Sequence, residues 1–211
     1  MAEHIILFVE GDTDEVLFKK IIARYKELAN YESNIICHID NLKGVSKYTS
    51  KAKGRLRNYY LKHIRKNKGS LKFVFCSYDT DVFEFQANPP INWPNLKKEM
   101  QGIVGKGKVI QIPVKTCIED WLLSDLSGLC RYLKIKDIPK KLTGKDAYMK
   151  ISNLFEKKGK VYSKGYDAEN IVQNINIDII LDKQMGIRLQ RKCFRFQFVC
   201  ECISVVQSQF H

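Results

Sequence analysis

The sequence lacks acidic residues over one long internal stretch. From Asn41 to Tyr78 there is no Asp or Glu, while eleven Lys and Arg residues fall there and the whole chain carries a formal net charge of +13. A local excess of cations concentrates positive potential on one side of a molecule, so this stretch predicts binding to a phosphate backbone. The cations expected to contact nucleic acid are Lys43, Lys47, Lys51, Lys53, Arg55, Arg57, Lys62 and Arg65.

The same stretch allows a second interpretation. A Lys-rich helix is also the ordinary surface of a protein, where the charges are solvated and bind nothing. Tyr48, Tyr59 and Tyr60 lie among the cations and could either pack in a core or stack on bases. The sequence leaves both alternatives open.

Long apolar runs and paired metal-binding cysteines are also missing. No apolar run approaches the roughly 18 to 20 residues that span a bilayer, and no basic segment precedes an apolar one at the N-terminus. We therefore expect a soluble, cytoplasmic protein with no membrane partner. The seven cysteines fit neither a disulfide framework nor a zinc pattern, and Cys37, Cys76 and Cys117 lie in or beside apolar runs as expected of small buried hydrophobes.

Strand and helix patterns alternate along the first part of the chain. Strands are expected at residues 5–9, 34–39, 71–77 and 108–114, with helices at 16–25, 48–66 and 95–104 and another after residue 114. This alternation predicts an α/β fold with a mainly parallel, Rossmann-like sheet flanked by helices. The later part contains helical patterns, including one over residues 193–206. We expect one domain over residues 1–130 and a helical C-terminal extension over 131–211, packed on the same domain.

Acidic residues follow three of the expected strands. Glu10 follows the first strand, Asp79 and Asp81 follow the third, and Glu119 comes after the fourth. In a parallel sheet the carboxyl ends of the strands meet at one edge, where ligands bind. Carboxylates that converge there repel one another unless cations lie between them, and oxygen ligands suit Mg²⁺ or Mn²⁺.

Two of these segments together resemble a known family. "ILFVEGDTDEVLF" followed by "FVFCSYDTD" is similar to the Toprim domain, whose signature is a glutamate in a strand-end turn and a later strand that ends in Asp-x-Asp. The resemblance covers roughly residues 4–125. "VEGDTDEVLF", "CIEDWLLSD" and Gly44 in "DNLKGVSKY" look most similar to OLD-type and related phage-defence Toprim proteins. It implies a Toprim-like fold and a metal-dependent endonuclease of DNA or RNA in anti-phage defence.

The resemblance also implies roles for individual residues. Glu10 would be a metal ligand or a general acid/base, and Asp79 and Asp81 would hold Mg²⁺ or Mn²⁺. Asp14 and Glu119 would extend the site to a second metal, with Asp120 a weaker candidate. Lys164 is a further catalytic candidate, because a late lysine approaches the metals in OLD-type sites.

One departure from the OLD pattern leaves the function open. OLD proteins carry an ATPase domain on the same chain, whereas this sequence has no Gly-x-x-x-x-Gly-Lys-Ser/Thr loop, so ATP hydrolysis would require a separate ATPase subunit. The alternative to a nuclease is a nucleic-acid-binding or sensor subunit without catalysis of its own. A homo-oligomer is compatible with either function.

Several residues near the acids are assigned structural roles. Asp12 or Thr13 can cap the first helix, and Glu15 is spaced to pair with Lys19 on its surface. Trp121 is expected in the core. His38 and His63 are expected to be structural residues without partners.

Overall fold

In a computed structural model of the protein, residues 2–28, 35–81 and 91–185 are described. The chain divides into two compact units. Unit 1 comprises Met1–Gly11 and Asn30–Val114, and unit 2 comprises Asp12–Ala29 and Lys115–His211. The expected division at residue 130 stays a prediction. The expected helix over residues 193–206 lies outside the described residues.

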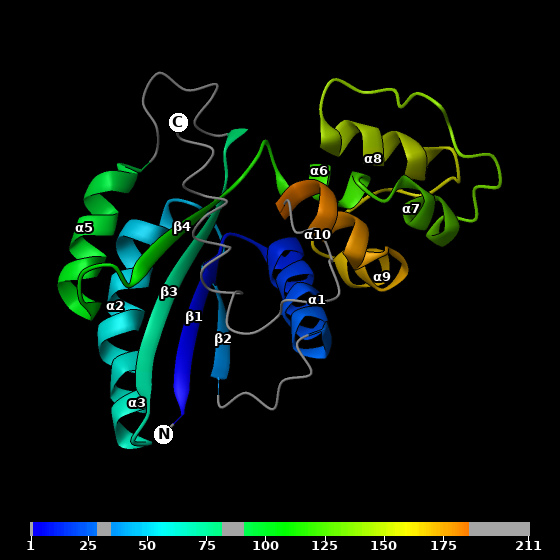
Figure 1. Cartoon of the computed structure of the whole chain (residues 1–211). Coiled ribbons are helices and arrows are strands. Elements are labelled where there is room, and N and C mark those ends of the chain that lie inside the picture. The colour runs from blue at the N-terminus through cyan, green and yellow to red at the C-terminus, as the bar shows by residue number, and fades with distance from the viewer. Residues whose placement is uncertain (1, 29–34, 82–90, 186–211) are drawn as a thin grey trace. The chain divides into compact units, whose positions relative to one another are not determined.

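Unit 1 is built on a four-stranded parallel sheet in the order β2-β1-β3-β4 (Figure 1). The strands are β1 (Glu3–Val9), β2 (Ile35–Asn41), β3 (Ser70–Asp79) and β4 (Val109–Val114). All neighbouring pairs run parallel. Six consecutive residues of β1 are buried, as expected of a strand covered on both faces. The predicted α/β class with a parallel sheet flanked by helices is confirmed.

Residues 48–66 of the basic stretch form one continuous helical segment with two wide turns. It consists of η1 (Tyr48–Ala52), α2 (Lys53–Arg55), η2 (Leu56–Tyr60) and α3 (Leu61–Lys66), where η marks π-helical turns. Its buried residues recur at every fourth position: Tyr48, Ala52, Leu56, Tyr60 and Ile64. In a regular α-helix a step of four residues drifts by about 40° around the axis. The wider π turns reduce that drift and keep the five side chains on one face.

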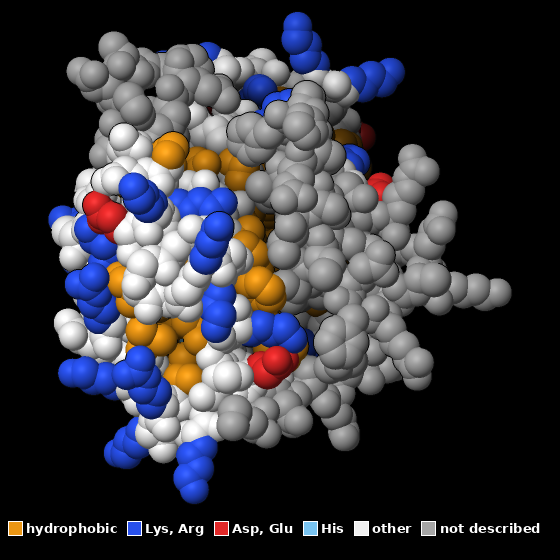
Figure 2. Space-filling view, turned by 60° about the vertical axis from the view of Figure 1, so that its left-hand side comes forward, with side chains coloured by type: hydrophobic (Ala, Val, Ile, Leu, Met, Phe, Trp, Pro, Cys, Tyr) orange, Lys and Arg blue, Asp and Glu red, His pale blue; other side chains and the backbone are white. Residues whose placement is uncertain are grey.

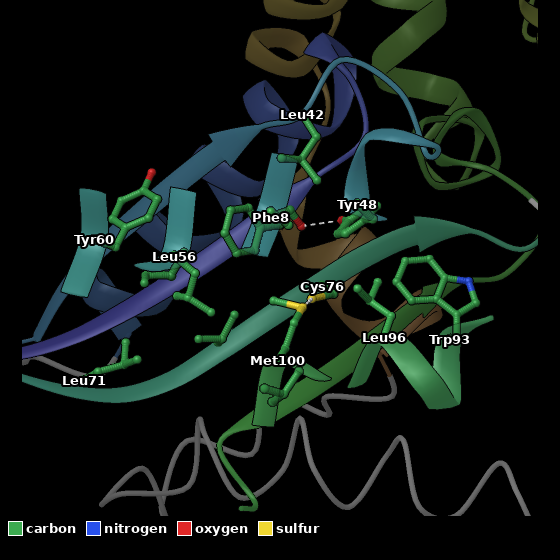
Figure 3. Close-up of a cluster of buried hydrophobic side chains, with 14 of the residues drawn as sticks. Phe8, Leu42, Tyr48, Leu56, Tyr60, Leu71, Cys76, Trp93, Leu96 and Met100 are labelled. Atoms are coloured by element: carbon green, nitrogen blue, oxygen red, sulfur yellow. Dashed lines mark hydrogen bonds between the residues drawn. The ribbon is translucent and has the colours of Figure 1, made fainter. Parts of the chain in front are cut away.

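These side chains pack into a core on one face of the sheet (Figure 3). α5 (Trp93–Val104) covers the same face and begins at an Asn92 side chain that accepts a hydrogen bond from Asn95 N. The Tyr48 and Trp93 rings meet edge to face with centroids 4.9 Å apart. Cys76 is buried there as a free thiol, and burial raises its pKa to about 12. The expectation that Cys76 behaves as a small hydrophobe is confirmed.

Three histidines gather at this sheet and helix, contrary to the expectation that His38 and His63 lack partners. His4 Nδ1 lies 2.8 Å from His38 Nε2, and the two rings stack with centroids 5.2 Å apart. The His63 ring meets the His38 ring edge-on at 6.2 Å. Burial lowers the pKa values of His4 and His38, and the neighbouring imidazoles lower them further. The partners are 34 residues apart in sequence, so local patterns could not reveal them.

Unit 2 is a group of helices. They are α1 (Asp12–Leu28), α6 (Ile118–Leu123), α7 (Leu126–Tyr132), α8 (Ala147–Glu156), α9 (Ala168–Asn174) and α10 (Ile177–Met185). Arg24 of α1 binds both carboxylate oxygens of Asp178 at 2.7 and 2.8 Å, which ties α1 to α10. The expected Glu15 to Lys19 ion pair is present at 2.6 Å, and Trp121 is buried as expected. Within the described residues, no helix is both long and apolar enough to cross a membrane.

Candidate active site

Unit 1 brings Glu10 and Asp79 together at adjacent strand ends. β1 ends at Val9, one residue before Glu10, and β3 ends at Asp79. β1 and β3 are neighbours in the sheet, and Asp79 N donates a hydrogen bond to Glu10 Oε1 at 3.1 Å. Asp79 is buried and Glu10 half-buried. The two halves of the sequence motif therefore meet in space, while their roles in catalysis stay predictions.

The loop after β2 is fastened to the same edge. Leu42 N donates to Val9 O at 2.9 Å, and Gly44 N donates to Glu10 O at 2.8 Å. Gly44 has a φ of 124°, which a residue with a Cβ rarely adopts. The glycine singled out in "DNLKGVSKY" thus allows the turn that holds the main chain of Glu10.

Tyr48 connects the basic helical segment to both acidic strand ends. Its buried hydroxyl lies 2.8 Å from Phe8 O and 2.5 Å from Ser77 O. Each of these carbonyls belongs to a residue two positions before a predicted ligand, Glu10 or Asp79. Tyr48 and Tyr60 are buried, so of the three tyrosines left open by the sequence these two pack, and only Tyr59, 62% exposed, presents its ring to solvent.

The acidic edge offers the donor chemistry of a hard cation. Glu10, Asp79 and the half-buried Asp81 supply only carboxylate oxygens, which suit Mg²⁺ or Mn²⁺. In the described part of the chain, no group of three or more His, Cys, Asp or Glu side chains is gathered closely enough to hold a metal ion. Mg²⁺ is often bound by one or two carboxylates with water and substrate phosphate completing its shell. The residues present fit that mode of binding.

Unit 2 joins Glu119 to Lys164 in an ion pair. Glu119, the second residue of α6, is 1% exposed, and its Oε2 lies 3.1 Å from Lys164 Nζ. The buried Tyr162 hydroxyl lies 3.4 Å from Glu119 Oε1. Burial and the nearby carboxylate raise the pKa of Tyr162, so this phenol stays protonated and can donate to Glu119. The lysine and the glutamate predicted for the site are therefore partners 45 residues apart in sequence.

The loop that carries Lys164 is fastened to the start of α1. Gly165 N donates to Thr13 Oγ1 at 3.2 Å. A Cβ on Gly165 would lie 3.1 Å from Asp12 Cβ, and its φ of 87° also favours glycine. Asp14 is buried in the first turn of α1. This packing brings the start of α1 and the Lys164 loop together within unit 2.

Of the eight cations predicted to contact nucleic acid, all but two are exposed to solvent. Lys53 forms an ion pair with Glu99, and Arg55 forms one with the buried Asp40. The other six predicted cations are exposed: Lys43, Lys47, Lys51, Arg57, Lys62 and Arg65. Figure 2 shows Lys and Arg side chains spread over the visible face with few acidic side chains among them. The surface has the charge expected of a phosphate-binding face, whereas Lys53 and Arg55 also hold structural contacts.

The six predicted catalytic and metal-binding residues are distributed between the two units. Unit 1 holds Glu10, Asp79 and Asp81, and unit 2 holds Asp14, Glu119 and Lys164. Sequence reasoning missed the bridging hydroxyl of Tyr48 and the contact of Tyr162 with Glu119. For Tyr48, the available sequence signal was the recurrence of apolar or aromatic residues at every fourth position from Tyr48 onward, which indicates a buried face. No local signal existed for the second.

No protein-family model matches this chain, and no curated protein matches it in sequence. Among solved structures, the C-terminal region of the OLD protein of Xanthomonas campestris pv. campestris is similar to this chain with a TM-score of 0.40 and 12% identity. That match covers 100% of this chain and 99% of the other. A similarity at this level carries no argument about activity.

Proposed function

We propose that this protein is a divalent-metal-dependent nuclease that cleaves phosphodiester bonds of DNA or RNA. The observation that supports this most is the hydrogen bond between Asp79 N and Glu10 Oε1, which brings the two halves of the acidic motif to adjacent strand ends. An exposed basic segment in the same unit supplies the charge that a phosphate backbone requires. The acids would then serve the chemistry while the cations hold the substrate.

Glu10, Asp79 and Asp81 are the groups we assign to Mg²⁺ or Mn²⁺ in unit 1. A bound ion would supply an activated water and stabilise charge on the leaving oxygen. Glu10 keeps its carboxylate oriented through the Asp79 N contact, and its main chain is held by Gly44. Glu10 is also the group placed to move a proton as general acid/base. Lys47 and Lys51 follow closely after the Gly44 loop and can bind backbone phosphates without reading base sequence.

The predicted site residues of unit 2 are given separate roles in this proposal. We assign Asp14 and Glu119 to an additional metal and Lys164 to the charge that develops on the scissile phosphate. The motif resemblance to OLD-type proteins leads us to propose anti-phage defence as the setting, with a separate ATPase subunit as activator. A homo-oligomer remains part of the same proposal.

A cleavage screen tests the proposal directly. Purified protein, alone and with a cognate ATPase, would be incubated with single- and double-stranded DNA, ribosomal RNA and tRNA in Mg²⁺, Mn²⁺ or EDTA. We expect cleavage that needs the metal and disappears in Glu10→Ala and Asp79→Ala, with the near-isosteric Glu10→Gln and Asp79→Asn guarding against misfolding. Glu15→Ala, which removes a nearby acid paired with Lys19, is the matched control and should cleave normally. Cleavage that survives both site substitutions would show the site to be wrong.

A second candidate is a nucleic-acid-binding or sensor subunit without catalysis. The ion pair of Glu119 with Lys164 favours it, because this buried carboxylate already has a countercharge within the protein. On this alternative the protein would bind nucleic acid equally well in Mg²⁺ and EDTA. Glu10→Gln would leave that binding unchanged, and no substrate in the screen would be cut.

A further inference from the structure

Unit 2 contains a second basic stretch, in addition to the one between Asn41 and Tyr78. Between residues 131 and 164 there are eleven Lys and Arg residues and only three acids, Asp137, Asp146 and Glu156. Ten of the eleven cations are exposed and Lys150 is half-buried. They are Arg131, Lys134, Lys136, Lys140, Lys141, Lys145, Lys150, Lys157, Lys158, Lys160 and Lys164. The stretch holds as many cations as the one from Asn41 to Tyr78.

These cations are little neutralised by the protein itself. Among the residues that the structure describes, Lys164 is the one member of the set that forms an ion pair, with Glu119. In the first basic stretch, by contrast, Lys53, Arg55 and Lys72 all pair with acids. The positive charge of unit 2 therefore remains available to an external anion.

Most of these cations lie on loops that are fastened to helices, while Arg131 lies in α7 and Lys150 lies in α8. Asn153 Nδ2 of α8 donates to Thr143 O at 2.9 Å, and the Asp146 side chain caps α8 by accepting from Met149 N at 2.7 Å. Lys160 Nζ lies over the Tyr132 ring at 5.5 Å from its centroid. A charged surface that is already ordered costs less conformational entropy when it binds a ligand.

Two exposed tyrosines lie close to these lysines in the sequence. Tyr166 is 84% exposed and Tyr148 is 46% exposed. Tyr148 contacts the buried Tyr162 with ring centroids 5.4 Å apart, and Tyr162 in turn approaches Glu119, the partner of Lys164. Flat aromatic faces beside cations are the combination that binds unpaired bases, because every base can stack on them while the cations hold the backbone.

We propose that residues 131–166 form a second nucleic-acid-binding surface, the lysine–tyrosine surface, which holds a single strand electrostatically and stacks an unpaired base on Tyr166. The assignment rests on the proposed nuclease function and adds a substrate class to it, namely single-stranded nucleic acid. It also gives the helical part of the chain a role. A double helix offers no free base faces, so it should bind through the lysines alone.

Binding of fluorescent oligonucleotides in EDTA tests the proposal without any cleavage. Tyr166→Ala should weaken binding of a single strand roughly ten-fold and leave duplex binding nearly unchanged, since one stacked base is lost. Tyr166→Phe keeps the ring and is the matched control, with affinity close to that of the natural protein. A Tyr166→Ala variant that binds single strands normally would overturn the stacking assignment.

The electrostatic part is tested through salt dependence. Replacing Lys140, Lys141 and Lys145 by Gln should lower the slope of log affinity against log salt by about 2 for a single strand. The same three positions changed to Arg should retain the slope. An unchanged slope in the Gln variant would overturn the assignment of this surface to nucleic acid.

The outcomes separate this inference from the proposed nuclease. If the natural protein cleaves and Glu10→Ala does not, while the Tyr166 and lysine variants bind normally, the surface is wrong and the nuclease stands. If the natural protein cleaves nothing but these variants lose single-strand binding as described, the nuclease is wrong and the binding surface stands.

Discussion

A single hydroxyl group contacts both of the strands that lead into the acidic edge. The Tyr48 hydroxyl joins the carbonyls of Phe8 and Ser77, which belong to neighbouring strands. Phe8 belongs to the last register pair of β1 with β3, Phe8 with Cys76, and Ser77 is the next residue of β3. The Tyr48 side chain thus contacts both strands where the pairing of β1 with β3 ends, two residues before Glu10 and Asp79.

Removing this hydroxyl should destabilise unit 1. Tyr48→Phe keeps the ring in the core but leaves two buried carbonyls without this donor, so we expect the free energy of unfolding to fall by about 1–3 kcal/mol. Denaturant unfolding followed by circular dichroism measures it. Tyr59→Phe is the control, because Tyr59 is exposed and should change little. Equal stability of the two variants would contradict the bridging role.

The histidine pair makes a prediction about pH. The pKa values of His4 and His38 are lowered, first by burial, so the unfolded chain binds protons more readily than the folded protein. Stability from this pair is therefore fully present above the unfolded histidine pKa of about 6.5 and is lost as pH falls below it toward the lowered folded values. We expect the unfolding free energy to drop between about pH 7 and pH 5.

Denaturant unfolding at the two pH values measures this drop. His38→Phe keeps a stacked ring on His4 without the second titrating group, so the drop should become smaller. His63→Gln should retain most of it, since the His63 side chain is exposed. If the unfolding free energy fell equally in the natural protein and in both variants, groups other than the histidine pair would cause the acid sensitivity.

At the scale of elements, local patterns predicted positions well where a segment has one buried face. The helical segment was expected over residues 48–66 and occupies these residues. β3 was expected to end at Ser77 but continues to Asp79, because Asp79 pairs with Val114 of β4. The extension matters, since it makes Asp79 part of the strand rather than of the loop after it. Pairing with a neighbouring strand is not visible in a local pattern.

The four-residue recurrence in the helical segment can be tested by adjacent substitutions. Leu56→Ala should lower the unfolding free energy by about 2–5 kcal/mol, because Leu56 is fully buried against the sheet and leaves a cavity. Arg57→Ala, one residue further on an exposed side, should cost less than about 0.5 kcal/mol. Comparable losses in both variants would show that the buried face is assigned incorrectly.

At the scale of the whole molecule, positive charge is concentrated in two stretches of the chain. A net charge of +13 could be spread evenly, yet two stretches hold 22 of the 36 Lys and Arg residues. Each unit contains one of these stretches together with part of the predicted acidic set. Each unit therefore combines a positively charged stretch with carboxylates that are predicted to bind metal.

In the first basic stretch, exposed cations should contribute more to the binding of duplex DNA than cations that already form ion pairs within the protein. Replacing the exposed Arg57, Lys62 and Arg65 by Gln should lower the salt slope for duplex DNA by about 3, since each released phosphate contact contributes about 0.9. Lys53→Gln should change it less, because Lys53 already pairs with Glu99. Fluorescence anisotropy titrations at several salt concentrations measure both. A larger effect from Lys53 would reverse our assignment of the binding face.

The sequence by itself determined the parallel α/β class, the order of strands and helices, and the acidic turns at Glu10 and Asp79, because these depend on local periodicity and strand-end positions. Only the tertiary structure decided the partners: Lys164 with Glu119, His4 with His38, and Tyr48 with two strand-end carbonyls. Each of these contacts joins residues at least 29 positions apart. A buried polar group needs a hydrogen-bond partner within the fold. Local sequence does not identify that partner, because the packing of segments that are distant in sequence decides which groups meet.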